Sequence, residues 1–218
     1  MRLILASASP RRAELIKKVA AQFEGLSVSI LPSAADERVF AGETPEGYAV
    51  RAAKLKAAEV ASRIFFTCGE TRQEDGAVPD AVVVLGCDTV VALDGQIFGK
   101  PADAQEAEGM FRALCGKTHD VITGVCLMRG GKNAKSVGAF QKTRVRFGAY
   151  NEALVRQYIL TDAPFDKAGG YGLQDPELSA LIRAVEGETD NVVGLPVRLV
   201  TRLLRETFLT DMQTGNKE

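Results

Sequence analysis

Segments with the pattern of buried strands alternate with helical segments along almost all of the 218 residues. Apolar or alternating strand patterns lie at residues 2–6, 26–30, 81–93, 120–128 and 135–147. The Asp94-Gly95 pair is typical of a hairpin turn and predicts one more short strand directly after residue 93. Because strands and helices interleave, we expect the α/β class, with a mixed twisted sheet and flanking helices.

Helical patterns fill the spaces between these strands. Ser9 and Pro10 are typical of the start of a helix, which the apolar stripe of Leu15, Ile16 and Val19 continues. Further helices are expected around residues 45–63, 107–114, 154–159 and 197–208.

No linker, internal repeat or low-complexity segment divides the chain. We therefore expect one domain over residues 1–210, with two lobes around a central cleft, and a frayed polar tail at 211–218. Polar residues at 67–80 predict a long loop, and the run at 162–175 predicts a glycine-rich one.

Composition excludes several classes of protein. The net charge is −1, from 27 basic and 28 acidic residues, so no charge footprint favours a nucleic-acid polymer or an anionic membrane as partner. No apolar run approaches the roughly 20 residues of a membrane span, and none resembles a signal peptide. Four cysteines without C-x-x-C spacing, beside one histidine, predict free thiols rather than a zinc site. We expect a cytoplasmic protein.

Two arginines stand in the first turn of the first predicted helix, at Ser9-Pro10-Arg11-Arg12. Cations there interact unfavourably with the helix dipole, at a cost of about 0.3–1 kcal/mol each, so they are unusual. A helix N-terminus attracts anions, and guanidinium groups match phosphate oxygens. The pattern predicts either a phosphate cradle or two solvated arginines, one of them paired with Glu14.

One acidic candidate lies within a predicted strand, and an acidic pair follows another strand. Asp88 lies next to Thr89 inside an apolar strand segment, where a lone carboxylate is costly unless it finds a cation or several donors. It is either a metal ligand or a base that activates water, or else a structural carboxylate bonded to nearby backbone N–H groups. The Asp36-Glu37 pair offers the oxygen ligands that Mg²⁺ prefers, but most such pairs are ordinary surface acids.

Lysines and glycines supply the remaining candidates. Lys54 on the alanine-rich helix and Lys100 between Gly99 and Pro101 are either phosphate-neutralising charges or solvated side chains. The run Asp166-Lys-Ala-Gly-Gly-Tyr-Gly-Leu-Gln174 permits close backbone approach to a ligand, and its Lys167, Tyr171 and Gln174 are candidate contacts to a substrate. The alternative is a mobile surface turn.

Other nucleotide and hydrolase signatures are absent from the sequence. It contains neither a Walker A motif nor a G-x-G-x-x-G dinucleotide fingerprint. A serine triad would have to use His119, the single histidine, without a G-x-S-x-G turn to serve it, so we expect a structural histidine.

Seven motifs in order resemble the Maf family of nucleotide pyrophosphatases, from residue 3 to about 205. They are Ala-Ser-Ala-Ser-Pro-Arg-Arg, Asp36-Glu37, Gly-Cys-Asp-Thr-Val-Val, Gly-Lys-Pro, Thr-His-Asp-Val-Ile-Thr-Gly-Val, the 166–174 run and Asn191-Val-Val-Gly-Leu-Pro196. The resemblance implies a fold similar to that of inosine triphosphate pyrophosphatase, an active site in the cleft, and a homodimer.

The same resemblance implies hydrolysis of nucleoside triphosphates to the monophosphate and pyrophosphate with Mg²⁺ or Mn²⁺. Asp88 matches the proposed base and, with Glu37, would bind the metal. The family's conserved Ser, Arg and Lys positions are matched here to Ser9, Arg12, Lys54 and Lys100.

The family divides by substrate, and three residues here resemble the branch that acts on dTTP, UTP and related pyrimidine nucleotides: Arg11, Thr89 and Gln174. Asp175 stands where that branch commonly has glycine. The alternatives are a purine- or 7-methyl-GTP-directed pyrophosphatase, and a non-catalytic nucleotide-binding regulator of cell division.

Overall fold

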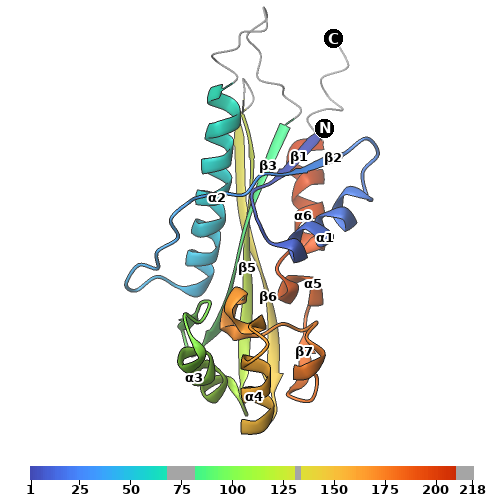
Figure 1. Cartoon of the computed structure of the whole chain (residues 1–218). Helices are drawn as coiled ribbons and strands as arrows, with labels where there is room; N and C mark the ends of the chain where they lie inside the picture. The colour runs from blue at the N-terminus through green and yellow to red at the C-terminus, as the bar shows by residue number, and fades with distance from the viewer. Residues whose placement is uncertain (68–81, 131–133, 210–218) are drawn as a thin grey trace, which may run out of the picture.

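The computed structural model describes residues 1–67, 82–130 and 134–209, and only the backbone of 66–67 and 208–209. Within these ranges seven strands form one sheet in the order β2-β1-β3-β5-β6-β7, with β4 also paired to β3 (Figure 1). The strands are β1 (Arg2–Leu5), β2 (Ser27–Ile30), β3 (Val82–Leu93), β4 (Gln96–Phe98), β5 (Thr118–Arg129), β6 (Lys135–Phe147) and β7 (Ile182–Glu186). β1 is parallel to β2 and β3, and the other pairs are antiparallel, so the predicted mixed sheet is confirmed.

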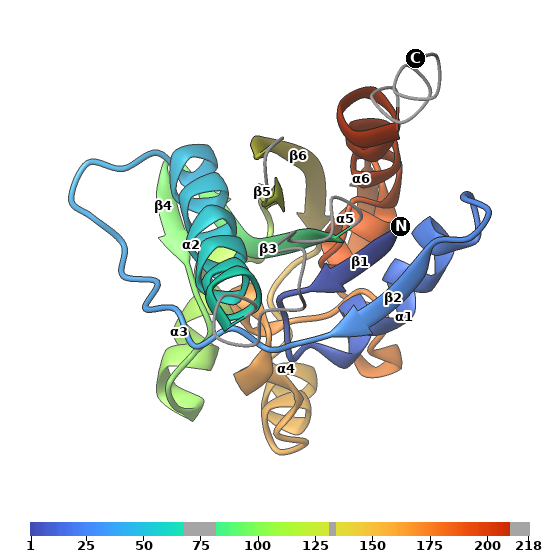
Figure 2. The same cartoon turned by 90° about the horizontal axis from the view of Figure 1, so that it is seen from above.

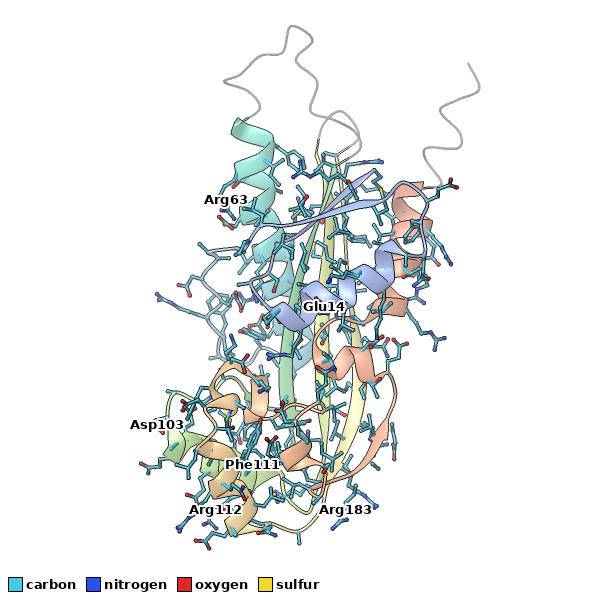
Figure 3. The ribbon with its side chains drawn as sticks, turned by 45° about the vertical axis from the view of Figure 1, so that its right-hand side comes forward. Glu14, Arg63, Asp103, Phe111, Arg112 and Arg183 are labelled. Atoms are coloured by element: carbon cyan, nitrogen blue, oxygen red, sulfur yellow. The ribbon has the colours of Figure 1, made fainter. Side chains whose placement is uncertain are left out.

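Helices cover both faces of this sheet (Figure 2). They are α1 (Pro10–Ala20), α2 (Pro45–Thr67), α3 (Ala104–Leu114), α4 (Glu152–Ile159), α5 (Thr189–Val193) and α6 (Val197–Leu204), the last continued by the π-helical η4 (Arg205–Leu209). On one face α2 packs against alternate residues of β3 such as Val84. On the other, α1 and α6 form one core, and α3 and α4 form another that contains Phe111 (Figure 3). Two cores on one sheet face correspond to the two predicted lobes.

β3 is longer than its neighbours on one side, and this leaves part of its edge open. β1 pairs with residues 82–85 and β4 with residues 91–93, whereas β5 pairs along 83–92 on the opposite side. The edge between, at 86–90, has no strand neighbour within the described chain. Asp88 and Thr89 lie there, with alternate side chains on opposite faces of the sheet. The strand pairing itself therefore makes room for a site.

α2 lies unusually close to the sheet because glycines face it. A Cβ added at Gly86 would come within 2.0 Å of the carbonyl oxygen of Ala53, and one at Gly124 within 2.2 Å of the backbone of Ala49. The glycines on the strands and the alanines on α2 thus allow the helix backbone to approach the strands closely. This close contact places side chains of α2 beside the open edge of β3.

We expect Gly86→Ala to lower the free energy of unfolding by about 3 kcal/mol or more, because the added methyl meets backbone atoms that cannot move separately. Gly109→Ala is the matched control, since its Cβ meets nothing within 4 Å in the interior of α3. That change should stabilise the protein by about 0.5–1 kcal/mol. Urea unfolding of both variants measures the difference, and a Gly86→Ala protein as stable as wild type would contradict the packing.

Most predicted elements are confirmed with small shifts of their ends. Asp94 and Gly95 both have positive φ, of 52° and 82°, as the predicted hairpin turn requires. α2 runs four residues beyond its predicted end at 63, because Ile64 and Phe65 pack against the core under the helix. The 162–175 run forms two 3₁₀ turns, η1 (Ala163–Asp166) and η2 (Ala168–Gly170), and η3 (Pro176–Leu178) follows them.

Sequence patterns did not predict β7 and α5. Each has five residues, too few to show a period, and they form because β7 pairs with the end of β6 and α5 packs against β5 and β6. Apart from Thr67, the predicted 67–80 loop lies outside the described residues, and so does the 211–218 tail. Cys68 belongs to that loop. Among the described helices, none is both long and apolar enough to cross a bilayer.

Candidate active site

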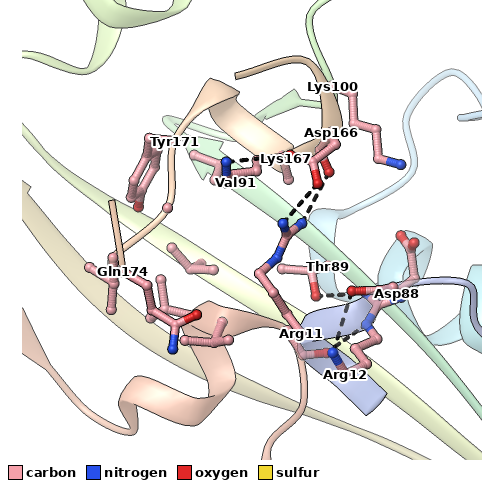
Figure 4. Close-up of a pocket in the computed structure, with 18 of the residues that line it drawn as sticks. Arg11, Arg12, Asp88, Thr89, Val91, Lys100, Asp166, Lys167, Tyr171 and Gln174 are labelled. Carbon is pink, nitrogen blue, oxygen red and sulfur yellow. Dashed lines mark hydrogen bonds and ion pairs between the residues drawn. The ribbon is translucent and has the colours of Figure 1, made fainter. Parts of the chain in front are cut away.

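A pocket opens at the free edge of β3, between the N-terminus of α1 and the 166–175 segment (Figure 4). It is lined by every predicted site residue except Asp36 and Lys54: Ser9, Arg11, Arg12, Glu37, Asp88, Thr89, Lys100, Lys167 and Gln174. Residues from five parts of the chain thus meet in one place. An adjoining hollow shares Ser9, Arg11 and Arg12 at the α1 end, and also Lys100.

The N-terminus of α1 points its first turn at the pocket. The Ser9 hydroxyl accepts a hydrogen bond from the backbone N–H of Arg12, which caps the helix as expected. Arg11 crosses toward η1, where it pairs with the Asp166 carboxylate at 2.8 Å and with the Asp166 carbonyl at 3.3 Å. Glu14 pairs with Lys17, so the alternative of an Arg–Glu14 surface pair is wrong.

Arg12 is held from three sides. Its Nε donates to the Gly194 carbonyl at 2.8 Å, and its Nη atoms donate to the hydroxyls of Ser7 and Thr89 at 3.3 and 3.0 Å. These partners come from the segments after α5, before α1 and in β3. An arginine fixed in this way is pre-organised to bind an anion that enters the pocket.

A buried polar network supports Arg12 from below. Thr123 donates to the Asn191 carbonyl at 2.9 Å, so the 2.9 Å contact between the hydroxyls of Thr89 and Thr123 uses the proton of Thr89. Asn191, fully buried, donates to Val121 O at 3.0 Å and to Thr143 Oγ1 at 3.1 Å. Thr89 therefore keeps only an acceptor lone pair for a ligand. Sequence reasoning found Asn191 as a motif but not this support role.

Asp88 and Glu37 converge on one ammonium group. Lys56 Nζ lies 2.7 Å from Asp88 Oδ1 and 2.7 Å from Glu37 Oε2, and all three side chains are largely shielded from solvent. Burial raises the pKa of Glu37, the Lys56 charge lowers it and the Asp88 charge raises it, and the net direction is upward. The three groups form a compact unit with an excess of one negative charge.

The loop before α2 brings Glu37 to this unit. Tyr48, in the first turn of α2, donates its hydroxyl to the Glu37 carbonyl at 2.9 Å. Burial, followed by the charges of Asp88 and Glu37, raises the pKa of Tyr48 to about 12, so it stays a donor at neutral pH. Asp36 pairs with Arg38 at the surface instead. The predicted acid pair is thus split, and only Glu37 faces the pocket.

The structure does not bring Lys54 into the pocket, and Lys56 lies at the place expected of it. Lys54 is exposed on α2 and does not line the pocket. Two residues along a helix correspond to a rotation of about 200°, so the two lysines point in nearly opposite directions. The packing of Ala53 and Ala57 against Gly86 turns Lys56, and not Lys54, toward the edge of β3.

The donor set of Glu37 and Asp88 fits a divalent cation. Two carboxylates with one ammonium leave a net negative charge, and Mg²⁺ commonly takes only one or two protein carboxylates and completes its shell with phosphates and water. Among the described residues, no cluster of three His, Cys, Asp or Glu side chains forms a dedicated metal cage. An ion at this unit would therefore depend on oxygens from the substrate.

Lys100 adds a positive charge to the lining of the pocket. Its side chain is exposed and lines the pocket, and its ammonium has no ion pair with the part of the chain that the structure describes. The Gly99 carbonyl accepts a 2.8 Å hydrogen bond from Gly169 N, and Pro101 is buried, so the backbone on both sides of Lys100 is fixed. The ammonium remains available to a ligand.

The glycine-rich segment forms the wall opposite Asp88 (Figure 4). Gly169 has φ 67° and approaches Val91 so closely that a Cβ would lie 2.7 Å from its side chain. Gln174 is exposed within the pocket, as a residue that contacts a base must be. Tyr171 lies differently from our prediction: its hydroxyl is directed into the core and only its ring borders the pocket.

His119 is structural, as predicted. Its Nε2 lies 2.7 Å from the Tyr171 hydroxyl, and its ring packs edge-on against Phe147 and Tyr171. Burial lowers the pKa of His119 to about 4, so the ring is neutral near pH 7. The three described cysteines, Cys87, Cys115 and Cys126, are free thiols.

Comparison with known proteins agrees with this geometry. A family model described as "Maf-like protein" matches residues 2–207. A protein of Anaeromyxobacter dehalogenans named dTTP/UTP pyrophosphatase is 40% identical, with 94% of this chain and 93% of that protein covered. Proteins of the same name from Chlorobaculum parvum and Thermosipho africanus are 39% and 40% identical, and cover 96% and 99% of this chain and 96% and 98% of their own lengths.

Solved structures give more distant likenesses. A Mycobacterium abscessus structure titled nucleoside-triphosphatase / dITP/XTP pyrophosphatase is 12% identical, with a TM-score of 0.45 and 97% of both chains covered. The Staphylococcus aureus Ham1 protein is 13% identical, with a TM-score of 0.48 and 94% of this chain and 99% of that chain covered.

Proposed function

The chain belongs to the Maf family, and from that premise we propose that it hydrolyses dTTP and UTP to the nucleoside monophosphate and pyrophosphate. The observation that carries the proposal is the arrangement of Asp88, Lys56 and Glu37 opposite a cationic helix end. A carboxylate pair that faces Arg11, Arg12 and Lys100 suits a substrate with several phosphates and one attacking water.

Each group has a distinct part in the proposed reaction. Asp88 accepts a proton from the water that attacks the α-phosphorus, and the bond from that phosphorus to the bridging oxygen breaks. Arg12 and Lys100, with the N-terminus of α1 capped by Ser9, stabilise the charge that gathers on the departing pyrophosphate. Lys56 offsets one of the two neighbouring negative charges and orients both carboxylates.

We propose that Glu37 and Asp88 also hold Mg²⁺ or Mn²⁺. Such an ion supplies positive charge next to the phosphates, and the net negative charge of the Asp88–Lys56–Glu37 unit supports this proposal. The free thiols and the nucleotide substrate class support a cytoplasmic location. A homodimer stays a prediction that analytical ultracentrifugation would test.

The test is pyrophosphate release from dTTP, UTP, GTP, ITP and 7-methyl-GTP, with Mg²⁺ and with EDTA. We expect metal-dependent release that is fastest with dTTP or UTP. Fastest release from a purine nucleotide would favour a purine-directed enzyme. No release from any nucleotide by the folded protein would favour the binding regulator, which would have no need of Asp88 and Lys56 beside the phosphates.

Gln174→Ala should change the preference among bases more than the rate on the best substrate. Its amide is the exposed polar group on the wall opposite Asp88, where it can donate to a carbonyl and accept from N3–H of thymine or uracil. Values of kcat/KM for the five nucleotides measure this effect, and Gln105→Ala, exposed on α3, is the control. An equal loss for all bases would contradict a role in reading the base.

A further inference from the structure

Lys167 lines the pocket, yet its ammonium is already fully bonded. Its Nζ lies 2.6 Å from the Ala163 carbonyl, 3.2 Å from Asp175 Oδ2 and 3.4 Å from Asp166 Oδ1. An ammonium has three N–H donors, so each has a protein oxygen within reach. The side chain is only 10% exposed. Lys167 therefore has no donor to spare for a substrate, in contrast to the role that the sequence suggested.

Asp175 connects this lysine to the core of the second lobe. Its Oδ2 also accepts a 2.5 Å hydrogen bond from the hydroxyl of Tyr158, a fully buried residue of α4. Burial, followed by the Asp175 hydrogen bond and charge, raises the pKa of Tyr158, so the phenol remains the donor. Asp175 itself is 19% exposed at the side chain. It is a shielded carboxylate shared by two donors.

Lys167 and Asp175 lie at the two ends of the glycine-rich segment. Residues 167 and 175 enclose Gly169 and Gly170, both with positive φ, and Gly172. Three glycines in four positions make a segment with a high entropic cost of ordering. The Lys167–Asp175 ion pair closes this segment on itself, and the bond from Asp175 N to Gly172 O at 3.3 Å tightens its end.

The closed segment carries Gln174, directly before Asp175. Gln174 makes no hydrogen bond with any described residue, so its place depends on the backbone that carries it. On the other side, Asp166 binds Lys167 and Arg11 with different carboxylate oxygens. Burial raises the pKa of Asp166, but the hydrogen bonds and charges of Arg11 and Lys167 together lower that pKa by more than burial raises it. The net shift is downward, so this carboxylate is ionised. Alternating charges thus run from Arg11 to Asp175.

We infer that Asp175 is a positioning residue that acts through Lys167 to close the 167–175 segment, and so holds Gln174 where it reads the base. The inference rests on the proposed function, because it assigns Gln174 to the nucleoside end of the substrate. Asp175 touches no reacting group. Its loss should therefore weaken recognition of the nucleotide and leave the chemical step on saturating substrate nearly unchanged.

The test is a double-mutant cycle with Asp175→Asn, Lys167→Met and their combination. Asparagine keeps the size of the side chain and an acceptor for Tyr158 but removes the charge that Lys167 needs. We expect Asp175→Asn to raise the KM for dTTP at least about fivefold, to narrow the dTTP/GTP preference, and to change kcat less than about twofold. In the Lys167→Met background the same substitution should have no further effect on KM. Glu177→Gln, an exposed neighbour, is the control.

Three results would overturn the inference. They are an unchanged KM, a rise in KM of equal size with and without Lys167, or a fall in kcat as large as the rise in KM together with a lower Tm. Calorimetric binding of dTTP in EDTA by all four proteins repeats the cycle without turnover. If wild type releases no pyrophosphate from any nucleotide, the proposed function fails. The binding cycle then still decides whether Asp175 acts through Lys167 on the nucleotide.

Discussion

Asp88→Asn should lower the turnover of dTTP by at least about a hundredfold, the scale of lost acid–base catalysis. The carboxylate lies at the open edge of β3, bound at 2.7 Å to Lys56 and beside Glu37. An amide at that position keeps the shape but can neither accept a proton from water nor balance the Lys56 charge. Single-turnover and steady-state rates of pyrophosphate release measure the loss.

The control for Asp88→Asn is Asp36→Asn, which removes a carboxylate that pairs with Arg38 outside the pocket. This second variant should turn over dTTP at close to the wild-type rate. Thermal unfolding of both proteins separates a chemical loss from a folding defect. Nearly normal turnover by a folded Asp88→Asn protein would remove Asp88 from the reaction and leave the site without its proposed base.

Lys56→Met should lower turnover by about a hundredfold, the scale seen when one pre-organised electrostatic partner is removed from an active site. Among the described residues, Lys56 is the one cation within 2.7 Å of both Asp88 and Glu37. Without it the two carboxylates repel each other, and protonation of one of them becomes favourable. The pKa of Glu37, which burial already raises, would then rise further. Pyrophosphate release at saturating dTTP measures the change.

Lys54→Met provides a matched control on the same helix. Its side chain is exposed and lies outside the pocket, so we expect turnover within about twofold of wild type and little change in Tm. The pair therefore tests the position of α2 over the sheet as well as the chemistry. Equal losses in the two variants, or a larger loss with Lys54→Met, would contradict the arrangement of the site.

The alternation of strand and helix can be predicted from the sequence, because β3, β5 and α3 each show a long, regular apolar pattern. The sequence does not show whether Lys54 or Lys56 faces the site, since alanines occupy several sides of α2 and leave no distinct apolar stripe. Only the contact of Ala53 and Ala57 with Gly86, a long-range feature, decides which lysine faces Asp88.

Motifs located most pocket residues, because each motif combines unusual polar or charged residues with glycine, proline or apolar neighbours. They did not reveal how the side chains are used. Lys167 looked like a substrate contact, but the folding of a glycine-rich segment gives it three protein acceptors instead. Arg12 and its partner Gly194 are 182 positions apart, and Thr123 and Asn191 in the supporting network are 68 apart. No local pattern records such pairings.

The most direct test of the proposed reaction is turnover of dTTP in ¹⁸O-labelled water with Mg²⁺, followed by mass spectrometry of both products. Attack by a water that Asp88 activates at the α-phosphorus predicts one ¹⁸O in dTMP and none in pyrophosphate. Label in pyrophosphate would mean attack at the β-phosphorus, and release of orthophosphate would mean attack at the γ-phosphorus. Either result would contradict the assignment of Asp88, Arg12 and Lys100 to their roles in this pocket.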